Sequence, residues 1–424
     1  MKGTSTTFPQ ILSLALFVLT PTTTSAHTSN SVYRRQSPDP TPPPPNHNGP
    51  GAIGWAYTHR ENDALYMYGG DKVQTIYGAN YTKDELYKLD LSTAWTTSEP
   101  VWTRLPSPDV KYPTVGIRSD RLVLLKDGSA LFAGTYISGV IRHIQSFNTR
   151  QRKWMPSMDQ NSVRGLFQLG KVTDLDTGLI YDIASESNTE GNCYLSIFDP
   201  ARGKMSDEPF ACGALGNNLG LGAPKGTYST FRRRIYYLET PSRFATMPEK
   251  AVIQSFNPAD KALTVVNTTG DIPDARIGSC FAAAYGGSKL ILLGGGMQVP
   301  KPSPGQTPTT ANVALKDVYM LDVATAVWTR LADAPSQYYV PVCAVSGDFL
   351  VVYGGYSAHP VANYNGTVVA NMGAPLILNL KDNVWVKEYT PAETSDAAAL
   401  VRGGLLGIYG VTVLGLAVGV FVGW

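Results

Sequence analysis

Residues Asp317 to Leu331 read DVYMLDVATAVWTRL, and the skeleton inside this stretch decides the fold. A large apolar residue, Leu321, precedes Asp322, and a second large residue, Trp328, follows Asp322 six positions later. An Asp or Asn after a large apolar residue returns six times, at spacings of 51 to 65 residues. These six residues are Asp90, Asn148, Asp199, Asn257, Asp322 and Asn379. Near-equal units of this kind indicate a repeat architecture.

Each unit contains four short runs that are typical of β-strands. The second run often ends in two glycines, as at Gly69-Gly70, Gly294-Gly295 and Gly354-Gly355. The fourth run carries the large residue, namely Trp102 (after an insertion), Trp154, Met205, Leu263, Trp328 and Trp385. Four strands in about 50–65 residues, repeated six times, favour propeller blades over a sandwich. We therefore predict an all-β, six-bladed β-propeller over residues 51–390.

A structural role explains each repeated residue, so none of them has to be catalytic. The Asp or Asn can accept hydrogen bonds from its own downstream backbone and so start a turn. The glycines permit positive φ or a close approach between neighbouring blades. The large residue is expected to fill the space between adjacent sheets, where its burial contributes about 1.5–3 kcal/mol.

The pattern resembles the kelch repeat, the propeller module that is also found in galactose oxidase. The resemblance is sharpest in the first, fifth and sixth units. In the middle units the glycine pair is replaced by Ala133-Gly134, Ile183-Ala184 and Glu239-Thr240. The resemblance implies a kelch-type propeller that acts as a protein-binding or carbohydrate-binding module.

The alternative that this resemblance implies is a secreted carbohydrate oxidase. Galactose oxidase-like enzymes hold copper with two His and two Tyr, and one Tyr is cross-linked to a Cys. The propeller region carries three histidines, His59, His143 and His359, and no Tyr-His dipeptide. A copper site needs several imidazoles that converge on one point. We therefore expect binding without a cofactor or metal, and we keep the oxidase as the alternative.

Charge argues against a nucleic-acid partner. The formal net charge is +2, and charged residues make up 16% of the 424 residues. No Lys/Arg-rich run accompanies this small charge.

Both ends of the chain predict a route to the cell surface. Residues 1–26 fit a signal peptide, because a short apolar run, 11–19, precedes the small residues Thr24-Ser25-Ala26. Residues 27–50 are rich in proline and predict an extended linker. After a spacer at 391–404, residues 405–424 carry no charge and predict a membrane anchor. The anchor is either a GPI-attachment signal or a transmembrane helix.

An extracellular location agrees with the N-x-S/T triplets and with the even count of cysteines. The triplets predict glycosylation at Asn80, Asn267 and Asn365. Four cysteines suggest two disulfides, and we favour a bond between Cys193 and Cys212. Cys280 and Cys343 occupy matching places in the predicted first strands of units five and six. They could form a disulfide between the two blades or remain two buried thiols.

Alignment of the units on their glycine position predicts a ring of binding residues. The predicted ring consists of Arg118, Arg164, Lys225, Arg276 and Tyr338. In kelch-type propellers the residue before the innermost strand lies at the rim of the central channel. Guanidinium groups there would suit carboxylates, sulfates or sugar hydroxyls. In the other interpretation, each Arg bonds a backbone carbonyl and serves packing.

Overall fold

The computed structural model describes a set of strands and turns that all belong to one compact unit, residues 42–424. The described residues are 49, 57–61, 64–68, 71–75, 78–81, 86–106, 122–126, 130–137, 140–155, 158–159, 171–185, 193–210, 225–239, 249–301, 309–356, 368–369 and 374–391. The predicted signal peptide, linker, spacer and anchor therefore lie outside the described residues, apart from Gly49 and Pro391. No described segment forms a helix of the length and apolarity that crossing a membrane requires.

The strands form six sheets of four or five strands, which we number one to six in chain order, and all their pairings are antiparallel except that of β21 with β27. Sheets one and two contain β1 (Tyr57–Glu61), β2 (Ala64–Tyr68), β5 (Leu86–Asp90) and β7 (Trp102–Leu105), then β8 (Leu122–Leu124), β9 (Ala130–Ile137), β10 (Val140–Asn148), β11 (Lys153–Trp154) and β12 (Met158–Asp159). Sheets three and four contain β13 (Val172–Thr173), β14 (Ile180–Ser185), β15 (Cys193–Asp199) and β16 (Lys204–Phe210), then β17 (Lys225–Ser229), β18 (Arg234–Leu238), β19 (Ile253–Asn257) and β20 (Ala262–Val266).

Sheets five and six complete the set. They contain β21 (Thr269–Gly270), β22 (Cys280–Ala284), β23 (Lys289–Leu293), β26 (Val318–Asp322) and β27 (Val327–Arg330), then β28 (Val342–Ser346), β29 (Phe349–Tyr353), β31 (Leu376–Asn379) and β32 (Val384–Val386). There are also three small sheets. One contains β3 (Asp71–Thr75), β4 (Gly78–Tyr81) and β30 (Val368–Val369), and a second contains β24 (Gly296–Lys301) and β25 (Thr309–Ala314). The third pairs β6 (Trp95–Thr96) with β33 (Glu388–Tyr389).

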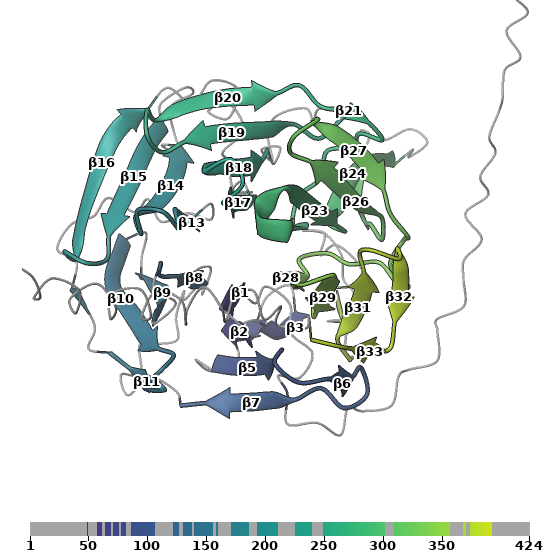
Figure 1. Cartoon of the computed structure of the whole chain (residues 1–424), viewed down its shortest axis with the longest axis horizontal. Coiled ribbons are helices and arrows are strands. Elements are labelled where there is room, and N and C mark those ends of the chain that lie inside the picture. The colour runs from purple at the N-terminus through teal and green to yellow at the C-terminus, as the bar shows by residue number, and fades with distance from the viewer. Residues whose placement is uncertain are drawn as a thin grey trace, which may run out of the picture. The chain divides into compact units, whose positions relative to one another are not determined.

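The sheets follow one another around a central axis (Figure 1). Their inner strands are β1, β8, β13, β17, β22 and β28. Strand β1 lies beside both β8 and β28, so the first strands of the first and last sheets are neighbours. The arrangement is an all-β propeller, as the sequence predicts, and at least five of the sheets are its blades. The total of six blades stays a prediction.

The repeated Asp or Asn starts the turn between the third and fourth strands, as predicted. In sheet five, Asp322 Oδ1 accepts hydrogen bonds from Ala324 N at 2.8 Å and Thr325 N at 2.9 Å. The other repeat residues accept equivalent bonds from backbone N–H groups two or three positions on, at 2.8 to 3.2 Å. The same local bond therefore shapes this turn in all six sheets.

The residue four positions after the repeat Asp or Asn adopts a left-handed backbone in sheets two to six. These residues, with φ between 52° and 59°, are Arg152, Gly203, Lys261, Ala326 and Asn383. A β-carbon in this region costs roughly 1–2 kcal/mol. Glycine occupies the position once, so the other four sheets carry strain that a substitution can relieve.

This strain gives a stability prediction at Ala326, which has φ 57°. We expect Ala326→Gly to raise the free energy of unfolding by up to about 1 kcal/mol, because glycine adopts this backbone without the steric cost. The matched control is Ala324→Gly in the same turn, which should lower stability by about 0.4–1 kcal/mol through the unfolded chain alone. Urea unfolding measures both changes. Two changes of the same sign would contradict the strain argument.

The large residue of the fourth strand packs against the preceding sheet, as predicted. Trp328 is 1% exposed and lies in a cluster with Tyr236, Leu238 and Ile253 of sheet four. Trp102 packs similarly on sheet six, Trp154 on sheet one, Leu263 on sheet three and Trp385 on sheet five. The side chain of Met205 lies outside the described part.

The insertion in the first unit holds the end of the last one. Strand β6, inside the insertion, pairs with β33, which follows the last sheet. Tyr389 is fully buried and stacks on Trp95, with ring centroids 5.1 Å apart. Its hydroxyl donates to Leu91 O at 3.0 Å. The insertion that breaks the repeat spacing therefore joins the two ends of the ring.

The glycine pairs allow a close approach of the next sheet, as predicted. Gly294 and Gly295 have φ of 61° and 97°. A β-carbon on Gly294 would lie 2.5 Å from Tyr338 O, in the segment that leads to sheet six. Gly354 and Gly355 also have positive φ, of 65° and 83°. Gly69-Gly70 falls outside the described residues.

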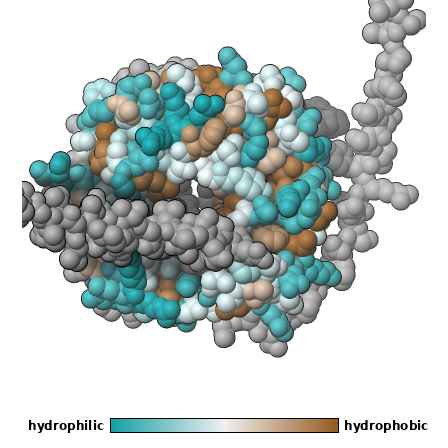
Figure 2. Space-filling view, in the orientation of Figure 1, coloured by the Kyte–Doolittle hydropathy of each residue, from teal (hydrophilic) through white to brown (hydrophobic). Residues whose placement is uncertain are grey.

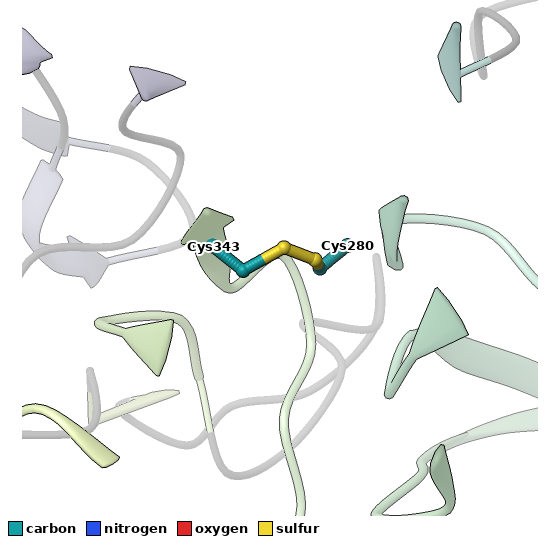
Figure 3. The surroundings of a disulfide bond; sticks show 2 residues. All are labelled: Cys280 and Cys343. Carbon is teal, nitrogen blue, oxygen red and sulfur yellow. A yellow bond between two sulfur atoms is a disulfide. The ribbon is translucent and has the colours of Figure 1, made fainter. Parts of the chain in front are cut away.

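A disulfide joins two neighbouring inner strands. Cys280 of β22 and Cys343 of β28 are bonded, with Cα atoms 6.0 Å apart (Figure 3). The bridge between blades is therefore the correct choice of the two that the sequence left open. The bond that we favour between Cys193 and Cys212 stays a prediction, because Cys212 lies outside the described residues.

Candidate functional site

The candidate site is a cavity of about 570 Å³ along the inner strands β13, β17, β22 and β28. Its lining is rich in small residues, which leave the channel wide: Gly226, Ala282, Ala283, Ala284, Ala344 and Gly347. Thr173, Thr227, Thr230 and Tyr228 add hydroxyl groups, and Lys171 adds a cation. Figure 2 shows hydrophobic and hydrophilic residues interspersed over this face of the ring.

The cavity lining reaches the turns that join inner strands to second strands, and we call these turns the rim. The turn of sheet five, η2 (Tyr285–Gly287), belongs to its lining. The turn of sheet four is bonded to it: Ser229 Oγ donates to Gly287 O at 2.7 Å, and Thr230 Oγ1 donates to Gly286 O at 2.6 Å. A β-carbon on Gly287 would lie 2.4 Å from the Ser229 Cα, so only glycine fits this approach. The rim is therefore a fixed surface made by two sheets.

Tyr285 is the most unusual residue of this rim. It has φ 52°, a conformation that bulky residues rarely adopt, yet its side chain is 43% exposed. Burial, and then a hydrogen bond to Asp348 in the turn of sheet six, raise the pKa of Tyr285 to about 12. The phenol is therefore neutral at physiological pH and can donate a hydrogen bond. Strained residues of this kind concentrate at binding and catalytic sites.

A second tyrosine lies deeper in the cavity wall. Tyr228 is 8% exposed. Burial raises its pKa, and hydrogen bonds to Asp174 and Asp176 add to that shift. Asp174 is itself held by the turn of sheet three, because its carboxylate accepts bonds from Asp176 N and Thr177 Oγ1. The wall therefore offers neutral hydroxyl groups in fixed positions.

The three described residues of the predicted ring lie at or before the starts of the inner strands. Lys225 begins β17, and Arg276 and Tyr338 precede β22 and β28, whereas Arg118 and Arg164 lie outside the described residues. None of the three described residues contributes to the cavity lining. The cavity is therefore lined by residues other than Lys225, Arg276 and Tyr338.

Arg276 has the contacts of a packing residue. Its side chain is fully buried and binds both carboxylate oxygens of Asp317, at 2.6 and 3.0 Å. It also donates to Gly294 O at 3.1 Å and Asp274 O at 2.9 Å. Tyr338 is 7% exposed, and burial raises its pKa. At Arg276 these contacts favour the packing interpretation; ligand binding by the other ring residues stays a prediction.

Two histidines of the oxidase alternative have a described backbone. His59 lies in β1 and His143 in β10, on different sheets, and His359 lies outside the described residues. Within the described residues, no group of three or more His, Cys, Asp or Glu is placed to hold a metal ion.

Comparison with known proteins agrees on the class of fold. No protein-family model matches the chain. Among solved structures, the propeller-type protein YjhT is similar, with a TM-score of 0.52. It is 13% identical, and the match covers 80% of this chain and 97% of YjhT. At this identity the likeness shows a β-propeller fold and nothing about the ligand.

Proposed function

We propose that the chain is an extracellular, membrane-anchored, six-bladed kelch-type propeller that binds a protein or a carbohydrate in its channel. The observation that carries the proposal is the cavity of about 570 Å³ with Tyr285 at its rim. Pockets of about 300–1,000 Å³ with a few placed polar groups are typical of ligand sites. An exposed Tyr beside a pocket is also typical of the residues that dominate protein interfaces.

The location rests on the sequence. The apolar run 11–19 and the three N-x-S/T triplets support passage through the secretory pathway, and residues 405–424 support an anchor. The inter-blade disulfide agrees with an oxidising compartment, where such bonds persist.

Tyr285→Gly tests the site. Relief of the backbone strain, about 1–2 kcal/mol, should offset the contacts that the 43%-exposed phenol side chain loses. We therefore expect a free energy of unfolding within about 1 kcal/mol of the native value. Binding of the full chain to intact source cells, or to an array of defined oligosaccharides, should fall on the order of tenfold, as for an interface anchor.

The matched control is Ala326→Gly, which relieves the same strain at φ 57° in a turn remote from the channel. That variant should bind as the native protein does. Equal binding by the native protein and Tyr285→Gly would show that the rim is not the site.

The anchor gives a separate prediction. If residues 405–424 are a GPI-attachment signal, phosphatidylinositol-specific phospholipase should release the protein from membranes into solution. A transmembrane helix would keep the protein in the membrane fraction after the same treatment, with Trp424 still present in the mature chain.

Binding without catalysis is part of the proposal. Metal analysis of the purified protein should find no stoichiometric copper. Bound copper together with oxidation of a sugar alcohol would favour the carbohydrate oxidase instead.

A further inference from the structure

The outer strand of sheet four, β20 (Ala262–Val266), has an open edge. It pairs with β19, and none of the other described strands pairs with its second side, where its N–H and C=O groups have no partner strand in the described part of the chain. Its sequence is ALTVV, without a charge or a proline. Val265 is 55% exposed. An uncharged, β-prone, open edge is a site for pairing with another chain.

The other outer strands that the structure describes carry a protection that β20 lacks. Strand β16 has Pro209 and exposed charges at Lys204 and Asp207, and β7 has the exposed Arg104. Strand β27 is covered by β21, whereas β11 and β32 have only two and three residues. Charge, proline, covering and shortness are the usual ways in which proteins protect edges. Strand β20 uses none of them.

An N-x-T triplet begins directly after this strand. Asn267 follows Val266, and Thr269 completes the triplet at the start of β21. Asn267 and Thr269 are both exposed. Asn267 is the first residue after β20, two positions from the exposed Val265, so a glycan on it would begin at the end of the open edge.

We propose that Asn267 carries an N-linked glycan that shields the open edge of β20. The modification joins a bulky, hydrated oligosaccharide to the Asn267 side-chain nitrogen beside the exposed Val265. The inference rests on the secretory route in the proposed function. To the glycosylation that the triplet predicts, it adds a role, which is to keep sheet four from pairing with a second copy of the chain.

The experiment uses the full chain, expressed in a eukaryotic secretory host and extracted in mild detergent. Mass spectrometry of the peptide that contains residue 267 should find the glycan in the native chain. It should also find the glycan in Thr269→Ser, which keeps the triplet, but not in Asn267→Gln. Sedimentation should show the associated fraction of Asn267→Gln rising on the order of tenfold, because the open edge is then uncovered. Adding Val265→Lys to Asn267→Gln should return it to the native level.

The other possible results of these experiments would overturn different parts of the proposal. A glycan on Asn80 or Asn365 with Asn267 unmodified would overturn this inference and leave the secretory route standing. No glycan at any of the three would overturn both. A glycan on Asn267 together with an Asn267→Gln variant that associates no more than the native chain would overturn the shielding role.

Discussion

Replacing Trp328 with alanine is expected to lower the free energy of unfolding by about 3–5 kcal/mol. The indole is 1% exposed and fills the space between sheets four and five, against Tyr236 and Leu290 among others. Its N–H has no hydrogen-bond partner among the described residues, so the loss reflects packing. Urea unfolding of the purified protein measures it.

Two controls make this result specific. Trp328→Phe keeps most of the apolar volume and should cost clearly less than Trp328→Ala. Val384→Ala, on an outer strand where Val384 is 48% exposed, should change stability by less than about 0.5 kcal/mol. Unfolding at the native urea midpoint by Trp328→Ala would mean that Trp328 does not fill a space between blades.

Replacing Arg276 with alanine is expected to cost a similar amount, about 3–5 kcal/mol. The change leaves the Asp317 carboxylate, which is 15% exposed, without the guanidinium group that binds both of its oxygens. It also removes the donors to Gly294 O and Asp274 O. Thermal or urea unfolding measures the loss.

The double variant Arg276→Met with Asp317→Leu separates a buried charge from a lost contact. A buried pair replaced by apolar residues of similar volume is often neutral, so this variant should recover much of the stability. Native stability in Arg276→Ala together with weakened ligand binding would instead assign Arg276 to the binding ring that the sequence predicts.

The repeat could be read from the sequence because its cause is local. Asp322 bonds to N–H groups only two and three residues away, so the turn depends on a few neighbouring positions. Trp328 marks the gap between sheets because a large apolar residue returns at the same offset in each unit. Both features repeat, and repetition makes them visible in one chain.

Ring closure and the disulfide could not be read in the same way. Tyr389 stacks on Trp95, although the two residues lie near opposite ends of the propeller sequence. No local pattern near either residue predicts this contact. The bond between Cys280 and Cys343 depends on where two inner strands lie in the ring. Four cysteines allow three pairings, and spacing alone left Cys280 and Cys343 open between a bridge and two buried thiols.

The cavity rim was also missed, although the sequence held a signal. The glycine pairs after the second strands predicted Arg276 and Tyr338 as binding residues. Both residues precede inner strands. Tyr285-Gly286-Gly287 instead follows a first strand. The positive φ of Tyr285 appears only in the structure, and it distinguishes this turn from an ordinary glycine turn.

The central claim is that the ligand binds at the channel rim, and site-specific photo-crosslinking tests it most directly. A photoreactive phenylalanine analogue is placed at position 285 or, as the matched control, at position 384 on the outer strand β32. Both native side chains are exposed, at 43% and 48%. After irradiation on intact source cells, the account predicts a discrete covalent adduct from position 285 and none from position 384. An adduct from position 384 alone, or equal adducts from both positions, would contradict it.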